Sequence, residues 1–250
     1  MTGLALEYAI RTDVGPVRRN NEDRAYASPR LAAVADGVGG AAAGEVASRA
    51  AIDALVHLDR CRLDAPLGDA LAAAVLTGNQ SIGFIASCRP ETAGMSTTLT
   101  AVALGDDGYV VTNIGDSRTY LLRDGLLSRL TRDDSLIQRL VESGAVSPDD
   151  ARRHPQRSVV LDALDGDPAR TPPPVTTVAA RTGDRLLLCS DGLSDYVDDE
   201  RIGDALRGIP SREECAERLV AAAIASGARD NVSVVVADVG PRRDPAAGWD

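Results

Sequence analysis

Side chains that favour zinc are scarce in this sequence. Its 250 residues include only two histidines and four cysteines, and the cysteines form no CxxC pair. Because zinc sites are built from such ligands at short spacings, one would be hard to assemble here. We therefore expect reduced, mostly buried thiols at Cys61, Cys88, Cys189 and Cys215.

Aromatic residues are also few, at 3% of the chain, although the hydrophobic fraction of 44% is ordinary for a globular protein. Leucine, valine, isoleucine and alanine must therefore fill the core. The length fits one domain, which we assign to residues 1–240. Residues 241–250 have no periodicity, and we expect them to form a mobile tail.

Two further absences concern location and partners. No segment approaches the roughly 20 apolar residues of a membrane span, and the N-terminus lacks the pattern of a signal peptide, so we expect a cytoplasmic protein without a membrane partner. The formal net charge is -10, which argues against a nucleic-acid partner. Clustered carboxylates favour cations instead.

The hydrophobic pattern changes its period along the chain. Alternating apolar residues predict a strand at Leu4–Thr12, and an apolar run predicts another at Leu31–Ala35. Further strands are expected at 98–104, 109–114, 119–123, 185–189 and 232–239, with helices at 44–58, at 66–87, from about 200 and from about 211. Since strands and helices come in groups and do not alternate, the sheets should be antiparallel with helices outside them.

The stretch 132–170 breaks this pattern, because it is polar and only partly helical. Ser147 and Pro148 are well suited to begin a small helix within it. We interpret this stretch as an insertion, or flap, on the single domain.

Five Asp-Gly pairs occur, and the pair is a common turn former. Asp107 and Asp124 lie between strand-like runs, as hairpin turns do, and Asp165 lies in the flap. Asp36 and Asp191 differ, because each follows an apolar strand and is followed by a loop or helix. Strand ends are favoured places for functional groups, so these two are candidate site residues.

Two more aspartates lie at strand ends. Asp116 lies between two predicted strands, and Asp230 lies just before the last one. Mg²⁺ and Mn²⁺ prefer carboxylates, carbonyls and water as ligands. An aspartate-rich, histidine-poor set suits these ions and does not suit zinc.

The motifs together resemble those of the metal-dependent protein phosphatases of type 2C, in particular their compact bacterial members. The similarity extends from Tyr8 to Val236. Six segments carry it in the family's order: TDVGPVRRNNED at 12–23, VADGVGG at 34–40, GMSTTL at 94–99, IGDSR at 114–118, CSDGL at 189–193 and RDNVS at 229–233. One such segment is a weak signal, whereas six in order are a strong one.

This resemblance implies a pair of core Mn²⁺ or Mg²⁺ ions. Asp36 would bridge them, and the backbone carbonyl of Gly37 would bind one. Asp191 and Asp230 would complete the other. Two such ions acidify a bridging water and clamp the oxygens of an in-line displacement.

It also implies roles for four neighbours. Glu22 and Asp23 would lie beside the metals, mostly through bound water, and Asp116 would help to bind a third, weaker ion. Arg18 would grip the substrate phosphate, for which a guanidinium is well suited because it donates two parallel hydrogen bonds and stays charged.

The fold implied is an α+β, four-layer α-β-β-α sandwich of two antiparallel sheets flanked by helices, with the metal centre at one edge. The function implied is hydrolysis of phosphoserine and phosphothreonine in proteins, among them a Ser/Thr kinase. Two alternatives remain: a regulatory phosphatase dedicated to one small phosphoprotein, and an inert binding module with this fold.

The chain departs from the family's pattern at several positions. Val38, Gly39 and Gly40 stand where some members have a histidine, so the proton for the leaving oxygen must come from water or another group, with Asp116 and its water as one candidate. Ser96 replaces a usual glycine. Asp134 replaces a usual histidine and adds negative charge at the root of the flap.

Overall fold

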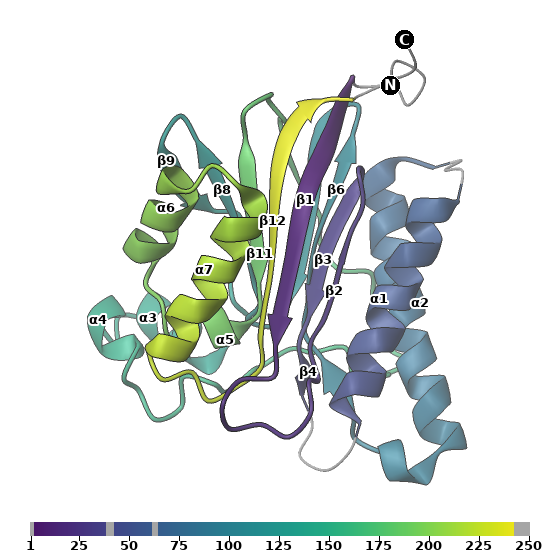
Figure 1. The fold of residues 1–250 in the computed structure, drawn as a ribbon. Helices are drawn as coiled ribbons and strands as arrows, with labels where there is room; N and C mark the ends of the chain where they lie inside the picture. The colour runs from purple at the N-terminus through teal and green to yellow at the C-terminus, as the bar shows by residue number, and fades with distance from the viewer. Residues whose placement is uncertain (1–2, 39–42, 62–64, 243–250) are drawn as a thin grey trace.

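The computed structural model, which describes residues 3–38, 43–61 and 65–242, contains two antiparallel five-stranded sheets. Helices α1 (Gly44–Arg60) and α2 (Leu67–Cys88) cover the outer face of one sheet, and α6 (Asp199–Gly208) and α7 (Arg212–Ala225) cover the other (Figure 1). The four layers confirm the predicted α-β-β-α sandwich.

The first sheet brings the two ends of the chain together. Its order is β1 (Leu4–Asp13), β12 (Val232–Pro241), β11 (Arg185–Cys189), β8 (Arg118–Arg123) and β9 (Leu126–Arg129). The strand β12 ends two residues later than predicted, because Pro241 still pairs with Leu4. Pro241 therefore belongs to the strand and not to the predicted tail, and residues 243–250 lie outside the described part of the chain.

The second sheet has the order β10 (Thr176–Val178), β7 (Gly108–Ile114), β6 (Leu99–Gly105), β3 (Leu31–Ala35) and β2 (Arg24–Ala27). A small separate pair joins β4 (Gly37–Val38) to β5 (Ser96–Thr97). The pattern did not reveal β2, β4, β5, β9 or β10, because these strands have two to four residues, too few to display a period.

The core has three apolar layers, and β3 shows how they are divided. All five of its residues are buried. Leu31, Ala33 and Ala35 face the helices α1 and α2, whereas Ala32 and Val34 face the other sheet. A strand covered on both faces reads as an unbroken apolar run, which is why the sequence pattern found it.

Helix α2 corrects the expectation that no segment is apolar and long enough to span a membrane. By length and composition it is, with a mean hydropathy of 1.3 over its most apolar window. In this fold its residues Leu71, Val75 and Ile82 pack into the core against the sheet. The same apolar composition therefore serves a core helix.

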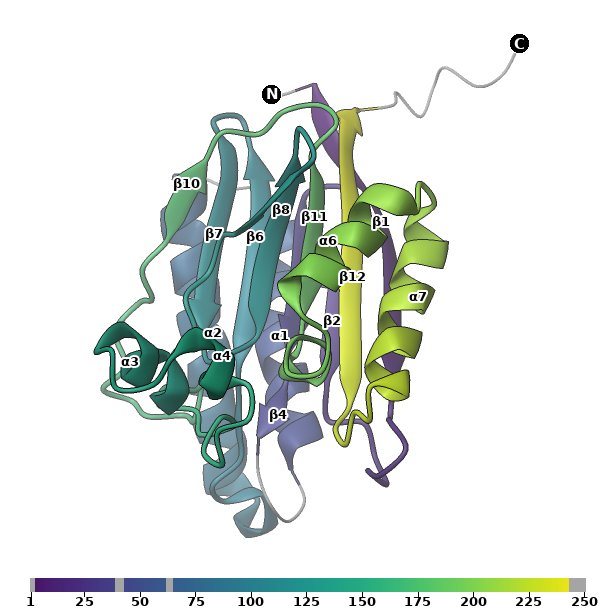
Figure 2. The ribbon, with the colours of Figure 1, turned by 90° about the vertical axis from the view of Figure 1, so that its left-hand side faces the viewer.

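The predicted flap contains two short helices, α3 (Leu136–Glu142) and α4 (Pro148–Ala151). Ser147 begins α4 as expected, since its hydroxyl accepts a hydrogen bond from the Asp150 backbone N–H at 3.1 Å. Both helices lie at the same end of the sandwich as β4 (Figure 2). The flap is thus placed beside the loops that carry the candidate site residues.

Candidate metal centre

Strand direction brings the predicted acids to one end of the sandwich. Asp36 follows β3, and Asp116 lies between β7 and β8. Asp191 follows β11 as the first residue of α5 (Asp191–Ser194), Asp230 precedes β12, and Asp23 precedes β2. Because neighbouring strands are antiparallel, all five positions fall at the same end.

Asp36 and Asp191 are half-buried among other acids. Loss of hydration, followed by repulsion from neighbouring carboxylates, raises the pKa of both side chains well above the usual value. A nearby cation would therefore stabilise the charged forms of Asp36 and Asp191.

Asp23 is 1% exposed and lies beneath this group. Its Oδ2 accepts a hydrogen bond from the Ser190 hydroxyl at 2.8 Å, whereas its buried Oδ1 has no partner. Burial raises the pKa of Asp23 to about 6, despite hydrogen bonds from Ser190 and Ser233 that lower it. Ser190, just before Asp191, thus ties the N-terminal loop to the end of β11.

Asn231 holds that loop against β12. Its amide Nδ2 donates to the carbonyls of Val14 and Asn20 at 2.9 and 3.0 Å, and its Oδ1 accepts from the Glu22 N–H at 2.8 Å. The sequence motif at 229–233 contains Asn231 directly after Asp230, but it did not indicate a role for this side chain. Its side chain sets the position of the loop that carries Arg18.

Glycines let Glu22 approach the carbonyl of Gly37. A Cβ atom placed on Gly44 would lie 2.2 Å from Glu22 Oε2 and 2.8 Å from Gly37 O. A Cβ on Gly37 would lie 2.3 Å from the carbonyl of Gly44. A side chain at either position would therefore separate two of the predicted oxygen ligands.

Arg18 pairs with Asp230, at 2.6 Å between Nη2 and Oδ2. The side chain of Arg18 is 50% exposed, so its guanidinium reaches both the acidic group and solvent. The hydrogen bond to Asp230 raises the pKa of Arg18. The structure thus joins the predicted phosphate ligand to a predicted metal ligand.

Asp116 is 8% exposed and has two acidic neighbours that the sequence reading did not single out, Asp133 and Asp195. Burial and these carboxylates raise its pKa to about 7. Arg118 donates to both oxygens of Asp133, and Arg157 of the flap pairs with Asp195 at 3.3 Å. Arginines therefore neutralise the neighbours, while Asp116 itself has no arginine partner among the ion pairs of the described residues.

Thr98 connects the loops that carry Asp36 and Asp116. Its buried hydroxyl accepts from the Asp36 N–H at 3.1 Å and shares a hydrogen bond with the Ser117 hydroxyl at 2.7 Å. The Thr98 N–H also donates to the Asp36 carbonyl at 2.8 Å. Thr98 lies in the segment 94–99, but the sequence pattern could not show that its hydroxyl links these two loops.

The donor chemistry fits a hard divalent cation. Two carboxylate oxygens, Asp23 Oδ1 and Asp191 Oδ1, are buried without a hydrogen-bond partner. The side chains of the predicted ligands offer only oxygen atoms to a metal ion. Within the described ranges, no three acids already surround one point as a complete ligand set. The individual ligand assignments from the sequence therefore stay predictions.

Other residues discussed from the sequence lie apart from this group or support it. Asp107 and Asp124 form hairpin turns, as predicted. His154 Nδ1 accepts a hydrogen bond from the Gln156 N–H, which is a contact within the loop.

Asp134, at the root of the flap, accepts a hydrogen bond from the Gly115 N–H at 3.3 Å, which ties the flap to the residue before Asp116. Asp134 also lies 3.7 Å from Arg132, so its charge is partly neutralised. Gly39 and Gly40 lie outside the described residues.

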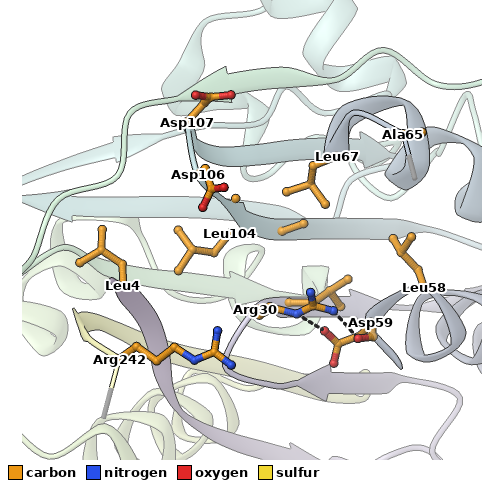
Figure 3. A pocket seen from close by; sticks show the side chains of 13 residues that line it. Leu4, Arg30, Leu58, Asp59, Ala65, Leu67, Leu104, Asp106, Asp107 and Arg242 are labelled. Carbon is orange, nitrogen blue, oxygen red and sulfur yellow. Dashed lines mark hydrogen bonds and ion pairs between the residues drawn. The ribbon is translucent and has the colours of Figure 1, made fainter. Parts of the chain in front are cut away.

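A pocket of about 320 Å³ lies at the opposite end of β3 (Figure 3). Arg30 and Asp59 pair at its side at 3.4 Å, and Leu4, Leu67 and Leu104 supply apolar walls. None of the acids at the metal end lines it. This pocket is therefore separate from the candidate metal centre.

Comparison with known families agrees with the resemblance that the motifs carry. The family model of protein phosphatase 2C matches residues 20–226. The chain belongs to this family.

Two curated relatives and one solved structure show how close the similarity is. The serine/threonine protein phosphatase PstP of Mycobacterium tuberculosis is 52% identical over 239 residues, which are 94% of this chain and 45% of PstP. The serine/threonine phosphatase stp of Listeria welshimeri is 34% identical over 238 residues, 92% of this chain and 94% of the relative. The catalytic domain of PstP, solved in complex with two manganese ions, has a TM-score of 0.87 at 49% identity, with 94% and 99% of the two chains covered.

These comparisons confirm the predicted family and fold class. The chain spans about half the length of PstP. The activity, substrates and partners of this chain are therefore the subject of the proposal below.

Proposed function

We propose that this chain is a metal-dependent phosphatase that hydrolyses phosphoserine and phosphothreonine in proteins. One observation carries the proposal. Acids from five separate segments meet at one end of the sandwich without enough cationic partners, and an arginine lies at their edge. Such an arrangement destabilises the fold unless cations bind to it.

The proposed ions are two Mn²⁺ or Mg²⁺, as manganese binds the catalytic domain of PstP. Asp36 would bridge them, with Gly37, Asp191 and Asp230 as further ligands, and Asp116 would hold a third. The chemistry that the ions supply when bound is a water acidified for in-line attack on phosphorus. Glu22 and Asp23 would orient bound water.

Arg18 would bind the phosphate of the substrate. Its guanidinium donates to Asp230 and is half exposed, so it can offer its remaining N–H groups to phosphate oxygens without leaving Asp230. This arrangement orients the phosphate beside the acidic group and requires no recognition of the surrounding peptide.

The proposed substrates are phosphorylated proteins, among them the activation loop of a Ser/Thr kinase. Phosphatase action on one dedicated phosphoprotein is the alternative within the same chemistry. An inert binding module is disfavoured, because such a module has no need to retain a set of destabilising buried acids. A cytoplasmic location without a membrane partner stays a prediction.

The test is hydrolysis of an aryl phosphate and of a phosphothreonine peptide by the purified chain, with Mn²⁺, with Mg²⁺ and with chelator. We expect activity only with added metal. Alkylation of the native protein should leave activity unchanged. Burial raises the pKa of Cys189 to about 12 and of Cys215 to about 11, which makes both poor nucleophiles. Cys61 and Cys88 are exposed, which corrects the expectation of mostly buried thiols, but neither has a role in the proposed chemistry. Activity that survives the chelator but is lost on alkylation would contradict the proposal.

A further inference from the structure

Two of the few nitrogen and sulfur ligands in the chain meet at the end of α1. Cys61 Sγ lies 3.5 Å from His57 Nε2, and both residues are exposed. The sequence has only two histidines and four cysteines, yet one of each lies in contact here. Histidine nitrogen and cysteine sulfur are the ligands that zinc prefers. The pair therefore offers a metal ion a different chemistry from the oxygen-rich candidate metal centre.

The helix holds the pair in place. His57 and Cys61 are four residues apart, so they lie on the same face of α1, one turn after the other. Cys61 directly follows the last helical residue, and its backbone N–H still donates to the carbonyls of His57 and Leu58 at 3.1 and 3.2 Å. These hydrogen bonds keep Cys61 in register with the helix. Zinc enzymes use the same spacing, with two histidines on one helix face.

The separation of the two atoms matches the geometry of zinc. Zinc binds sulfur at about 2.3 Å and histidine nitrogen at about 2.0–2.1 Å, with tetrahedral angles. Two such bonds that meet at about 109° place the sulfur and the nitrogen about 3.5 to 3.6 Å apart. The observed separation of 3.5 Å lies in this range, so one ion can bind both atoms without a change in the backbone.

The pair is open to solvent and to ions. Asp53 lies one turn before His57, and all three residues line a groove of about 550 Å³ between α1 and α2. Asp53 pairs with Arg49 at 3.6 Å. Among the described residues, no third histidine, cysteine or acid completes a ligand set. Water would fill the remaining positions, so this is an open site for an exchangeable ion and not a closed structural zinc site.

Cys88 shows what distinguishes Cys61 from an ordinary exposed thiol. It is also exposed, at the end of α2, but its hydrogen-bond partner is the Ser87 hydroxyl, at 3.9 Å from its Sγ. No histidine contacts Cys88 in the hydrogen bonds of the described residues. The chain thus contains a control for the effect of the imidazole.

We propose that His57 and Cys61 form a binding site for thiophilic divalent cations such as zinc. The thiol would release its proton to the buffer as its sulfur binds the ion, and His57 would bind through Nε2. The site is remote from the metal centre, because α1 begins beside Gly37 and its 17 residues make it about 25 Å long (Figure 1). Soft ions would bind near one end of α1 and hard ions near the other.

The test is titration of the 250-residue chain with Co²⁺ at saturating Mg²⁺, followed by the sulfur-to-cobalt charge-transfer band. Only a sulfur ligand gives this band, so cobalt bound by the acids of the metal centre does not contribute. We expect one such ion per chain, displaced by Zn²⁺. Cys61→Ser should abolish the band, and His57→Ala should weaken binding by at least about tenfold. Cys88→Ser is the matched control and should leave the titration unchanged.

A second measurement tests zinc itself. Maleimide labelling followed by mass spectrometry gives separate rates for Cys61 and Cys88. Zn²⁺ should slow the labelling of Cys61 by about tenfold and leave Cys88 unchanged, because a metal-bound thiolate is a poor nucleophile. His57→Ala should remove most of this protection.

Three outcomes would overturn the proposal. They are a cobalt band that survives Cys61→Ser, a His57→Ala variant that binds as tightly as the unchanged chain, and equal protection of both thiols by Zn²⁺. Circular dichroism and manganese-dependent hydrolysis without zinc should be unchanged in all three variants, since His57, Cys61 and Cys88 are exposed and lie outside the metal centre. A loss of phosphatase activity in every protein would count against the proposed function and leave this site intact.

Discussion

Aspartates lie at both ends of β11, Asp184 buried and Asp191 half-buried, but their surroundings are opposite. At one end Asp184 is 2% exposed and accepts hydrogen bonds from Tyr109 at 2.6 Å, from Arg123 at 2.7 and 2.6 Å, and from the Arg181 N–H at 2.8 Å. Burial by itself would raise the pKa of Asp184, but the hydrogen bonds outweigh burial and lower it. This carboxylate is stable in its charged form.

At the other end of β11, the acids around Asp191 lack such partners. The pKa values of Asp23, Asp36, Asp116 and Asp191 are all raised, first by burial and then by neighbouring carboxylates. The difference distinguishes two kinds of buried carboxylate by their hydrogen-bond donors. A carboxylate with a full set of donors stabilises the fold, whereas a group without them costs stability and marks a site for a cation.

The sharpest test of this contrast is Asp36→Asn. We expect turnover to fall by about a thousandfold, which is about 4 kcal/mol of transition-state stabilisation, because a bridging ligand is lost. The metal-free protein should become more stable, since one source of repulsion is removed. Manganese-dependent hydrolysis and urea unfolding in chelator measure the two effects, and normal turnover would refute the proposed role.

Asp184→Asn should have the opposite effects, a loss of stability with turnover unchanged. It leaves the guanidinium of Arg123 without its charged partner, so we expect a loss of about 3 kcal/mol in the free energy of unfolding. Turnover per folded molecule should stay near normal, because the site is at the other end of β11. Urea unfolding and the same hydrolysis assay apply, and a loss of turnover without a loss of stability would break the comparison.

Thr98→Val tests whether the metal end needs its supporting hydrogen bonds. The substitution keeps the shape but removes the hydroxyl that joins Asp36 to Ser117, so we expect activity or manganese affinity to fall by about 10- to 100-fold. Thr98→Ser should restore most of it. Calorimetric titration with Mn²⁺ separates binding from turnover. If valine and serine behave alike, the hydroxyl has no positioning role.

The pH dependence of stability should differ between the two ends. The folded-state pKa values of Asp23 and Asp116, about 6 and about 7, exceed the ordinary 3.8, so the folded protein binds more protons between these limits. Stability of the metal-free protein should therefore fall as the pH rises through this window, by on the order of 2 kcal/mol. Asp184, with its lowered pKa, contributes in the opposite sense, since its stabilisation is lost as the pH falls.

Urea midpoints at about pH 5 and pH 7, with chelator and with Mn²⁺, check this prediction. Saturating Mn²⁺ should remove the loss of stability at the higher pH, because the ion binds the charged carboxylates. A metal-free protein that is more stable at the higher pH would show that the acids at the metal end are compensated after all.

The smallest effect is expected for Arg18→Ala. Its guanidinium makes charge-assisted hydrogen bonds to phosphate in the proposed complex, so the Michaelis constant for a phosphopeptide should rise by about tenfold. The turnover number should change less, because phosphate binding in the ground state is its main role. Steady-state kinetics measure both constants, and a change confined to the turnover number would contradict this division.

The sequence by itself determined the family, the layered fold and the strand ends at which acids occur. Six ordered segments placed Asp36, Asp116, Asp191 and Asp230 at strand ends, because an apolar run that stops at an aspartate is visible in the pattern. It did not reveal the short strands or Asn231 as the anchor of the N-terminal loop. A single polar side chain has no periodicity.

Only the tertiary structure decided which carboxylates have partners. Asp184 and Asp191 flank the same strand, yet Arg123 and Tyr109 reach the first and no arginine among the described residues pairs with the second. Those contacts join residues far apart in the chain, and the pKa of a carboxylate depends on the charges and donors that surround it in space.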